Sequence, residues 1–170
     1  MAWQSEMTRI LRYMLNDLDS SSYTYSDDRL EETIIVSAQL VLHEIDFDKD
    51  YAVDVDALTL TPDPTAATKD NAFINLVSLK SACIILSSEL RTKSLESVRV
   101  SDGASTIDTN GIIKGFESLS KSMCQAYEDA KIQHKAGNSV AGQAILSPYG
   151  SPNFPIVHGE GHNTRTGYFE

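Results

Sequence analysis

Three aspartates at alternate positions, in the segment DFDKDYAVDVD, are the first candidates for chemistry. Asp46, Asp48 and Asp50 match the first three ligand positions of an EF-hand calcium loop. The sixth position of that loop requires Gly for a sharp turn, but the chain has Tyr51 there. The twelfth position requires a bidentate Glu, but the chain has Ala57. The pattern therefore favours a solvated acidic loop that leads into a strand.

A second cluster, HGEGH, places His158 and His162 on either side of Glu160. A zinc site requires more ligands than these and a rigid support, so only weak metal binding by the two histidines stays open. The pair His43-Glu44 is not followed by a second His one helical turn later, so the zincin pattern is absent. The sequence also shows no glycine-rich phosphate loop and no nucleophile–base arrangement. We expect a protein that is not an enzyme and that has no cofactor or metal.

The composition is that of a globular protein with an acidic surface. Apolar residues make up 41% of the chain, the net charge is −10 and the pI is about 4.7. This charge argues against a protein that holds nucleic acid through clustered Lys and Arg. No stretch approaches the ~18 consecutive apolar residues that span a bilayer. The N-terminal segment MAWQSEMTRI lacks the basic start and apolar run of a signal peptide. We expect synthesis in the cytoplasm and no membrane partner.

The two cysteines, Cys83 and Cys124, both lie in apolar stretches with helical spacing. Buried free thiols are the expected state in a reducing cytosol, where disulfides are rare. The alternative is a disulfide, which requires the two helices to meet at these positions.

Apolar residues at three- and four-residue spacing predict four helices, which form a bundle over residues 1–137. Ser26 and Asp70 are the predicted N-caps of the second and third helices. The predicted apolar stripes are Trp3, Met7, Ile10, Met14 and Leu18 in the first helix; Leu30, Ile34, Ala38, Val41 and Ile45 in the second; Ala72, Leu76, Leu79, Cys83, Leu86 and Leu90 in the third; and Ile112, Phe116, Leu119, Met123, Ala126 and Ala130 in the fourth.

Two segments between the helices favour β structure. Residues 51–62 alternate apolar and polar residues and then slip in phase before Leu58. In residues 97–107, Asp102-Gly103 stands between two short runs, which is a strong indication of a hairpin. The expected fold class is mainly α: a helical bundle of about four helices with a small β-hairpin element and an extended C-terminal arm.

The predicted C-terminal arm, residues 138–170, is rich in Gly and Pro and has too few apolar residues for a core of its own. A segment of this kind can become ordered on the surface of a partner. The alternative is an ordinary disordered tail. The apolar residues expected to contact a partner are Tyr149, Phe154, Ile156, Tyr168 and Phe169.

Two parts of the chain resemble the head–tail connector, or adaptor, proteins of tailed double-stranded DNA bacteriophages. They are SDDRLEETIIVSAQLVLHEID (26–46) and STIDTNGIIKGFESLSKSMCQAYEDAKIQHKAG (105–137). In that family, an acidic capped helix begins near a DDRLEE-like run, and the final helix carries a YEDA-like segment before an extended tail. The resemblance extends over roughly residues 1–140 and lies in the order and character of the elements.

This resemblance implies a structural protein in the neck of a virion, made in the host cytoplasm. Members of the family form a ring, usually of twelve copies, beneath the portal ring of the capsid. The ring extends the DNA channel and docks the tail or the next neck protein. The implied partners are the portal protein, tail or neck proteins and further copies of the chain. DNA would pass through without specific binding, because acidic groups in the channel repel its backbone.

Within this interpretation the C-terminal arm is expected to dock on the portal or on a neighbouring subunit. Arg99 and Asp102, beside the predicted hairpin turn, are expected at contacts between subunits, and residues 51–62 are a further candidate. The nearest alternative is a tail-completion or tail-terminator protein, which meets the tail tube. An alternative of another class is a small helical enzyme or regulator with a site that the sequence does not reveal.

Overall fold

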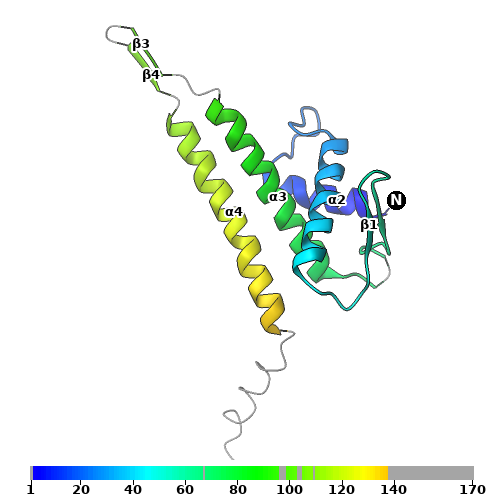
Figure 1. Cartoon of the computed structure of the whole chain (residues 1–170). Coiled ribbons are helices and arrows are strands. Elements are labelled where there is room, and N and C mark those ends of the chain that lie inside the picture. The colour runs from blue at the N-terminus through cyan, green and yellow to red at the C-terminus, as the bar shows by residue number, and fades with distance from the viewer. Residues whose placement is uncertain (1, 67, 96–98, 103–104, 109, 138–170) are drawn as a thin grey trace, which may run out of the picture. The chain divides into compact units, whose positions relative to one another are not determined.

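The computed structural model describes residues 2–66, 68–95, 99–102, 105–108 and 110–137. The elements follow in the order α1 (Ala2–Leu15), α2 (Asp27–Glu44), β1 (Ala52–Asp54), β2 (Thr59–Thr61), α3 (Asn71–Leu95), β3 (Arg99–Asp102), β4 (Ser105–Asp108) and α4 (Asn110–Gly137). The described chain is mainly helical, with four helices and two antiparallel two-stranded hairpins (Figure 1). The mainly α class expected from the sequence is confirmed. The first compact unit spans residues 1–132, and the second begins at residue 133, within α4.

The first helix ends at Leu15, earlier than the predicted stripe requires. Asn16 adopts a left-handed backbone with φ 56°, which Asn tolerates better than most residues. The amide of Asp17 then donates to the carbonyl of Arg12, which closes a Schellman-type C-cap. Leu18 therefore lies beyond the helix and is exposed, so its predicted place in the core is wrong.

The predicted N-caps of α2 and α3 are both confirmed. The Ser26 hydroxyl accepts a hydrogen bond from the Arg29 amide at 3.3 Å. The Asp70 carboxylate accepts one from the Phe73 amide at 3.0 Å. Each cap satisfies an amide that has no partner within the helix, so the two sequence positions fix where the helices begin.

The core lies where α1, α2 and α3 pack together, beside the β1–β2 hairpin (Figure 1). All five residues predicted for the α2 stripe are buried. In α3 the prediction was only partly correct, because Ala72 is exposed while Phe73, Val77 and Ile85 are buried. This helix is covered on more than one side, by α1 and α2 and by α4, so its buried residues do not form one narrow stripe.

By length and composition alone, α3 is the one helix among the described residues that could cross a membrane. Half of its apolar window is buried inside the structure. Buried core helices meet the same criterion, so this property alone does not show that α3 spans a membrane.

Residues 51–62, for which the sequence favours β structure with a slip in phase, form a hairpin of two strands. Strand β1 pairs with β2, with Val53 opposite Leu60. The phase slips because the turn lies there: the Asp54 carboxylate accepts hydrogen bonds from the amides of Asp56 and Ala57, both at 3.0 Å. Leu58 completes the turn with a positive φ of 50°.

The second hairpin pairs β3 with β4, as the sequence predicted. Arg99 is opposite Asp108, and Asp102 is opposite Ser105. The turn at residues 103–104 lies outside the described residues. The hairpin connects α3 to α4 along the chain.

Candidate functional site

The contact between α3 and α4 is an antiparallel seam, here called the α3–α4 seam. Cys83 and Cys124 form a disulfide, with their Cα atoms 4.8 Å apart. One turn further along α3, the Ser87 hydroxyl lies 3.1 Å from that of Ser120, one turn back along α4. A step of four residues forward along α3 therefore corresponds to a step of four residues back along α4, which shows that the two helices are antiparallel. Their ribbons run side by side in Figure 1.

The expectation of two free thiols was wrong, because Cys83 and Cys124 are bonded to each other. Small residues occupy the centre of the seam, and they allow the two backbones to approach closely. Ser120 is buried there. The seam therefore holds α4 through a covalent bond and hydroxyl groups at its centre and through the buried Tyr127 nearer the C-terminal end of the helix.

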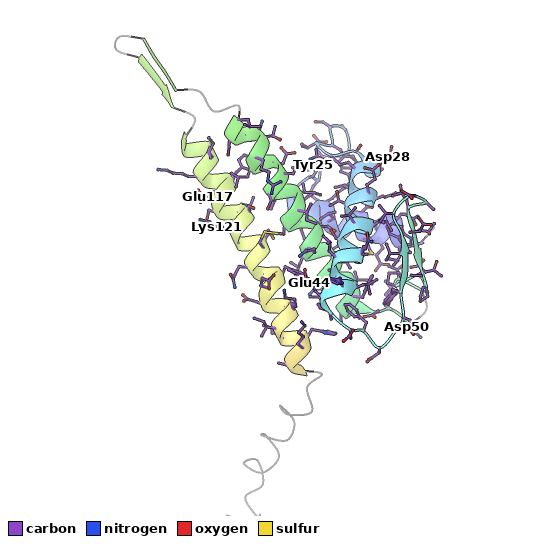
Figure 2. All side chains as sticks on the ribbon, in the orientation of Figure 1. Tyr25, Asp28, Glu44, Asp50, Glu117 and Lys121 are labelled. Carbon is purple, nitrogen blue, oxygen red and sulfur yellow. A yellow bond between two sulfur atoms is a disulfide. The ribbon has the colours of Figure 1, made fainter. Side chains whose placement is uncertain are left out.

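Nearer the C-terminal part of α4, the carboxylate of Glu44 in α2 accepts hydrogen bonds from three side chains of α3 and α4. Glu44 lies at the end of α2 (Figure 2). It accepts a hydrogen bond from Lys80 of α3 at 2.9 Å. It also accepts from the Tyr127 hydroxyl and from Lys131, both of α4 and both at 2.9 Å. The Lys80 ammonium lies 4.4 Å from the centre of the Tyr127 ring, within cation–π range.

Tyr127 is buried, although it was not among the residues predicted for the core. It lies 83 residues from Glu44 in the sequence. No local pattern indicates a contact over that distance. We refer to Glu44, Lys80, Tyr127 and Lys131 as the Glu44 cluster, which joins α2, α3 and α4.

Electrostatics in the Glu44 cluster favour the charged carboxylate. Burial alone would raise the pKa of Glu44, but the hydrogen bonds from Lys131, Lys80 and Tyr127 together lower it to about 2. Burial, followed by the hydrogen bond to Glu44, raises the pKa of the Tyr127 hydroxyl. Hydrogen bonds to Glu128 and Glu44 raise the pKa of the Lys131 ammonium. At neutral pH these shifts keep Glu44 as a carboxylate, Lys131 as an ammonium group and Tyr127 as a neutral phenol.

The lowered pKa of Glu44 gives a pH-dependent contribution to stability. The folded pKa lies below the ordinary value of 4.5, so this contribution is complete above pH 4.5 and is lost as the pH falls towards 2. Over this range the free energy of unfolding of Glu44→Gln should change with pH by about 1–2 kcal/mol less than that of the unmodified chain. The difference is of this modest size because the Glu44 side chain is 29% exposed and solvent screens its interactions. Urea denaturation at pH 5 and pH 2.5 measures the difference.

Glu117→Gln provides the matched control for this measurement. Glu117 forms an i,i+4 ion pair with Lys121 at 2.7 Å on the exposed surface of α4 (Figure 2). Both side chains are exposed, so this pair contributes little to stability. Equal loss of pH dependence in the two variants would contradict a special role for Glu44.

The predicted apolar stripe of α4 lies beside the seam rather than in it. The seam contains Ser120, Cys124 and Tyr127, each one residue away from the predicted Leu119, Met123 and Ala126. The prediction for Leu119 was wrong, because its side chain is 45% exposed. Ile132 is also exposed, at 62%, but it is only two residues past Ala130 and therefore lies on another side of the helix. We refer to Leu119 and the half-covered residues on the same side of the helix as the α4 stripe: Phe116, Leu119, Met123, Ala126 and Ala130.

The outer face of α2 is also partly apolar. Val36 and Leu40, four residues apart on this helix, are both exposed. Acidic residues precede them at the start of this helix, where Asp28 and Glu32 are exposed. Burial, and then the charges of Asp27 and Asp28, raises the pKa of Glu31. The start of α2 therefore presents concentrated negative charge beside an apolar patch.

Three aspartates of the predicted acidic loop, Asp46, Asp48 and Asp50, are exposed. Tyr51, at the position where an EF-hand requires Gly, instead stacks on Phe73 with ring centres 4.1 Å apart. Among the described residues, no group of three His, Cys, Asp or Glu side chains is placed to hold a metal.

The remaining predicted site residues are not brought into a described site. Arg99 and Asp102 lie at the two ends of β3, and their role between subunits stays a prediction. The HGEGH segment lies outside the described residues. So do the predicted docking residues of the arm, Tyr149, Phe154, Ile156, Tyr168 and Phe169.

Comparison with known proteins identifies no relative. No protein-family model matches the chain, and no curated protein or solved structure is significantly similar to it. A function therefore has to be inferred from the chain's own residues, chiefly the α4 stripe, the seam and the acidic surface.

Proposed function

We propose that the chain is a structural head–tail connector of a tailed double-stranded DNA bacteriophage. It assembles into a ring beneath the portal, extends the DNA channel and docks the tail or the next neck protein. The α4 stripe is the observation that carries this proposal. Its exposed residue Leu119 lies beside half-covered apolar neighbours on one side of a long helix, and such a surface is typical of a protein contact.

The distribution of charge also supports this role. The chain has a net charge of −10, and several copies in one ring multiply this charge. Exposed acids such as Asp28 and Glu32 repel a DNA backbone, so a channel lined by them lets DNA slide without sticking. The ring forms through contacts between unlike surfaces of neighbouring copies, as closed rotational symmetry requires.

The sequence of the C-terminal arm fits the same role. The five apolar residues expected to contact a partner, from Tyr149 to Phe169, are spread along a Gly- and Pro-rich segment. Each arm would contribute a weak contact with the portal or with a neighbour. Repetition around a ring makes the sum of such contacts strong.

A charge placed in the α4 stripe tests the proposal. We expect Leu119→Glu to weaken ring assembly on purified portal by about tenfold or more, because burying an unpaired carboxylate costs more than about 1.4 kcal/mol. Sedimentation of the full chain with portal rings measures the binding.

Ala72→Glu is the matched control, since it adds the same charge at an exposed position in the first turn of α3. It is expected to bind as the unmodified chain does. Undiminished binding by Leu119→Glu would rule out the α4 stripe as the assembly surface. Binding of the chain to tail tubes and not to portal would instead favour a tail-terminator protein.

A further inference from the structure

A groove of about 630 Å³ runs beside the disulfide, and nothing in the proposed assembly role uses it. Both cysteines contribute to its walls, together with Lys80, Ser118, Lys121, Ser122, Gln125, Tyr127 and Glu128. Cys83 and Cys124 are each only partly buried. The volume is in the range that admits a molecule the size of a tripeptide.

We propose that Cys83–Cys124 is a thiol–disulfide exchange site for low-molecular-weight thiols, and that its redox state controls how firmly the N-terminal half of α4 is held on α3. The open groove gives a small thiol access to both sulfur atoms. Structural disulfides in closed cores lack such access, and accessible ones are those that exchange. The inference does not depend on the connector role.

The surroundings of the two sulfur atoms differ, and the difference indicates the direction of attack. The Ser87 hydroxyl lies 3.8 Å from Cys124 Sγ and can donate a weak hydrogen bond to it. Such a donor stabilises negative charge on that sulfur, so Cys124 is the better leaving group. The incoming thiolate therefore attacks Cys83 Sγ. The ammonium groups of Lys80 and Lys121, in the same groove walls, further favour thiolate formation.

The exchange proceeds in two balanced steps. A small thiolate forms a bond to Cys83 Sγ as the bond between the two protein sulfurs breaks, and Cys124 leaves as a thiolate that takes up a proton. A second small thiolate then attacks the sulfur of the bound small molecule, releases a small-molecule disulfide and leaves Cys83 as a thiolate, which is protonated in turn. Two electrons pass from the two small thiols to the protein, and a small-molecule disulfide reverses both steps.

The described contacts of α4 are unequal on the two sides of Cys124. On the C-terminal side, Tyr127 is buried and Tyr127 and Lys131 both bond to Glu44. On the N-terminal side, the described tie is the hydrogen bond between Ser120 and Ser87, and Phe116 is only partly buried. Breaking the disulfide therefore loosens residues 113–123 and leaves the Glu44 cluster in place.

Hydrogen exchange on the full chain in glutathione buffers tests this inference. As reduced glutathione replaces oxidised glutathione, alkylation and mass measurement should show both thiols becoming free in the folded protein. Amides of residues 113–123 should then exchange about tenfold faster, and those of residues 127–131 should change by less than about threefold. A disulfide that resists millimolar glutathione under native conditions would overturn the proposal. So would equal acceleration in both segments, or none.

Ser87→Ala distinguishes an exchange site from a merely exposed disulfide. It removes the hydroxyl beside Cys124, so reduction by glutathione should slow by about threefold. Ser122→Ala is the control, because Ser122 lines the same groove but has no described bond to either sulfur. Equal reduction rates in the two variants would contradict the assignment of Cys124 as the leaving sulfur.

Discussion

The Asp17→Ala variant is expected to lose about 3–5 kcal/mol of its free energy of unfolding, because it leaves a buried charge without its closest partner. Arg12 and Asp17 form an ion pair with side chains only 7% and 4% exposed. The Asp17 carboxylate also accepts hydrogen bonds from the amides of Thr24 and Tyr25, at 2.8 and 3.3 Å. Its removal leaves the Arg12 guanidinium with only the exposed Asp27 as a charged partner among the described residues. It also leaves two amides of the loop between α1 and α2 without their acceptor.

Asp27→Ala separates this effect from the loss of any ion pair. Asp27 bonds the same guanidinium at 2.7 Å, but its side chain is 68% exposed. The loss of this exposed partner should cost about 1 kcal/mol or less. Urea denaturation monitored by circular dichroism compares the two variants. Similar destabilisation of both would show that burial does not set the strength of the Arg12 contacts.

The double variant Cys83→Ser/Cys124→Ser should lose about 4 kcal/mol of unfolding free energy at 25 °C, since the disulfide constrains the unfolded chain. The two cysteines are 41 residues apart, so the closed loop is long and its loss of entropy in the unfolded state is large. Serine replaces each sulfur by a hydroxyl of similar size in a seam that already contains Ser87 and Ser120. The folded state is therefore little disturbed.

The unmodified chain with its disulfide reduced provides the matched comparison. It should have the same unfolding free energy as the double variant to within about 1 kcal/mol, because both lack the same cross-link. A double variant as stable as the oxidised chain would show that the Cys83–Cys124 bond contributes nothing to the attachment of α4.

The sequence allowed the elements and caps to be predicted because they depend on local chemistry. Ser26 and Asp70 lie next to the first helical turn, and their side chains reach only the nearest free amides. The α2 stripe was correct because this helix packs its wide apolar face onto α1 and α3. The hairpin over residues 51–62 could also have been found, since the Asp54 turn lies where the alternation slips.

The α3–α4 seam could not be predicted in the same way, because it depends on how two helices rotate about their axes. A rotation by one residue exchanges Leu119 for Ser120 and Ala126 for Tyr127 at the contact. Hydropathy favours the first alternative, but the disulfide and Tyr127 select the second. The Glu44 cluster likewise joins residues distant in sequence, and only the fold brings them together.

Electron microscopy of the chain mixed with purified portal rings of tailed phages tests the proposed function most directly. The connector role predicts a second ring, made of this chain, stacked on the portal and coaxial with its DNA channel. Leu119→Glu should remove that ring, while Ala72→Glu should retain it. Portal rings that stay bare, with the unmodified chain free in solution or bound only to tail tubes, would contradict the account.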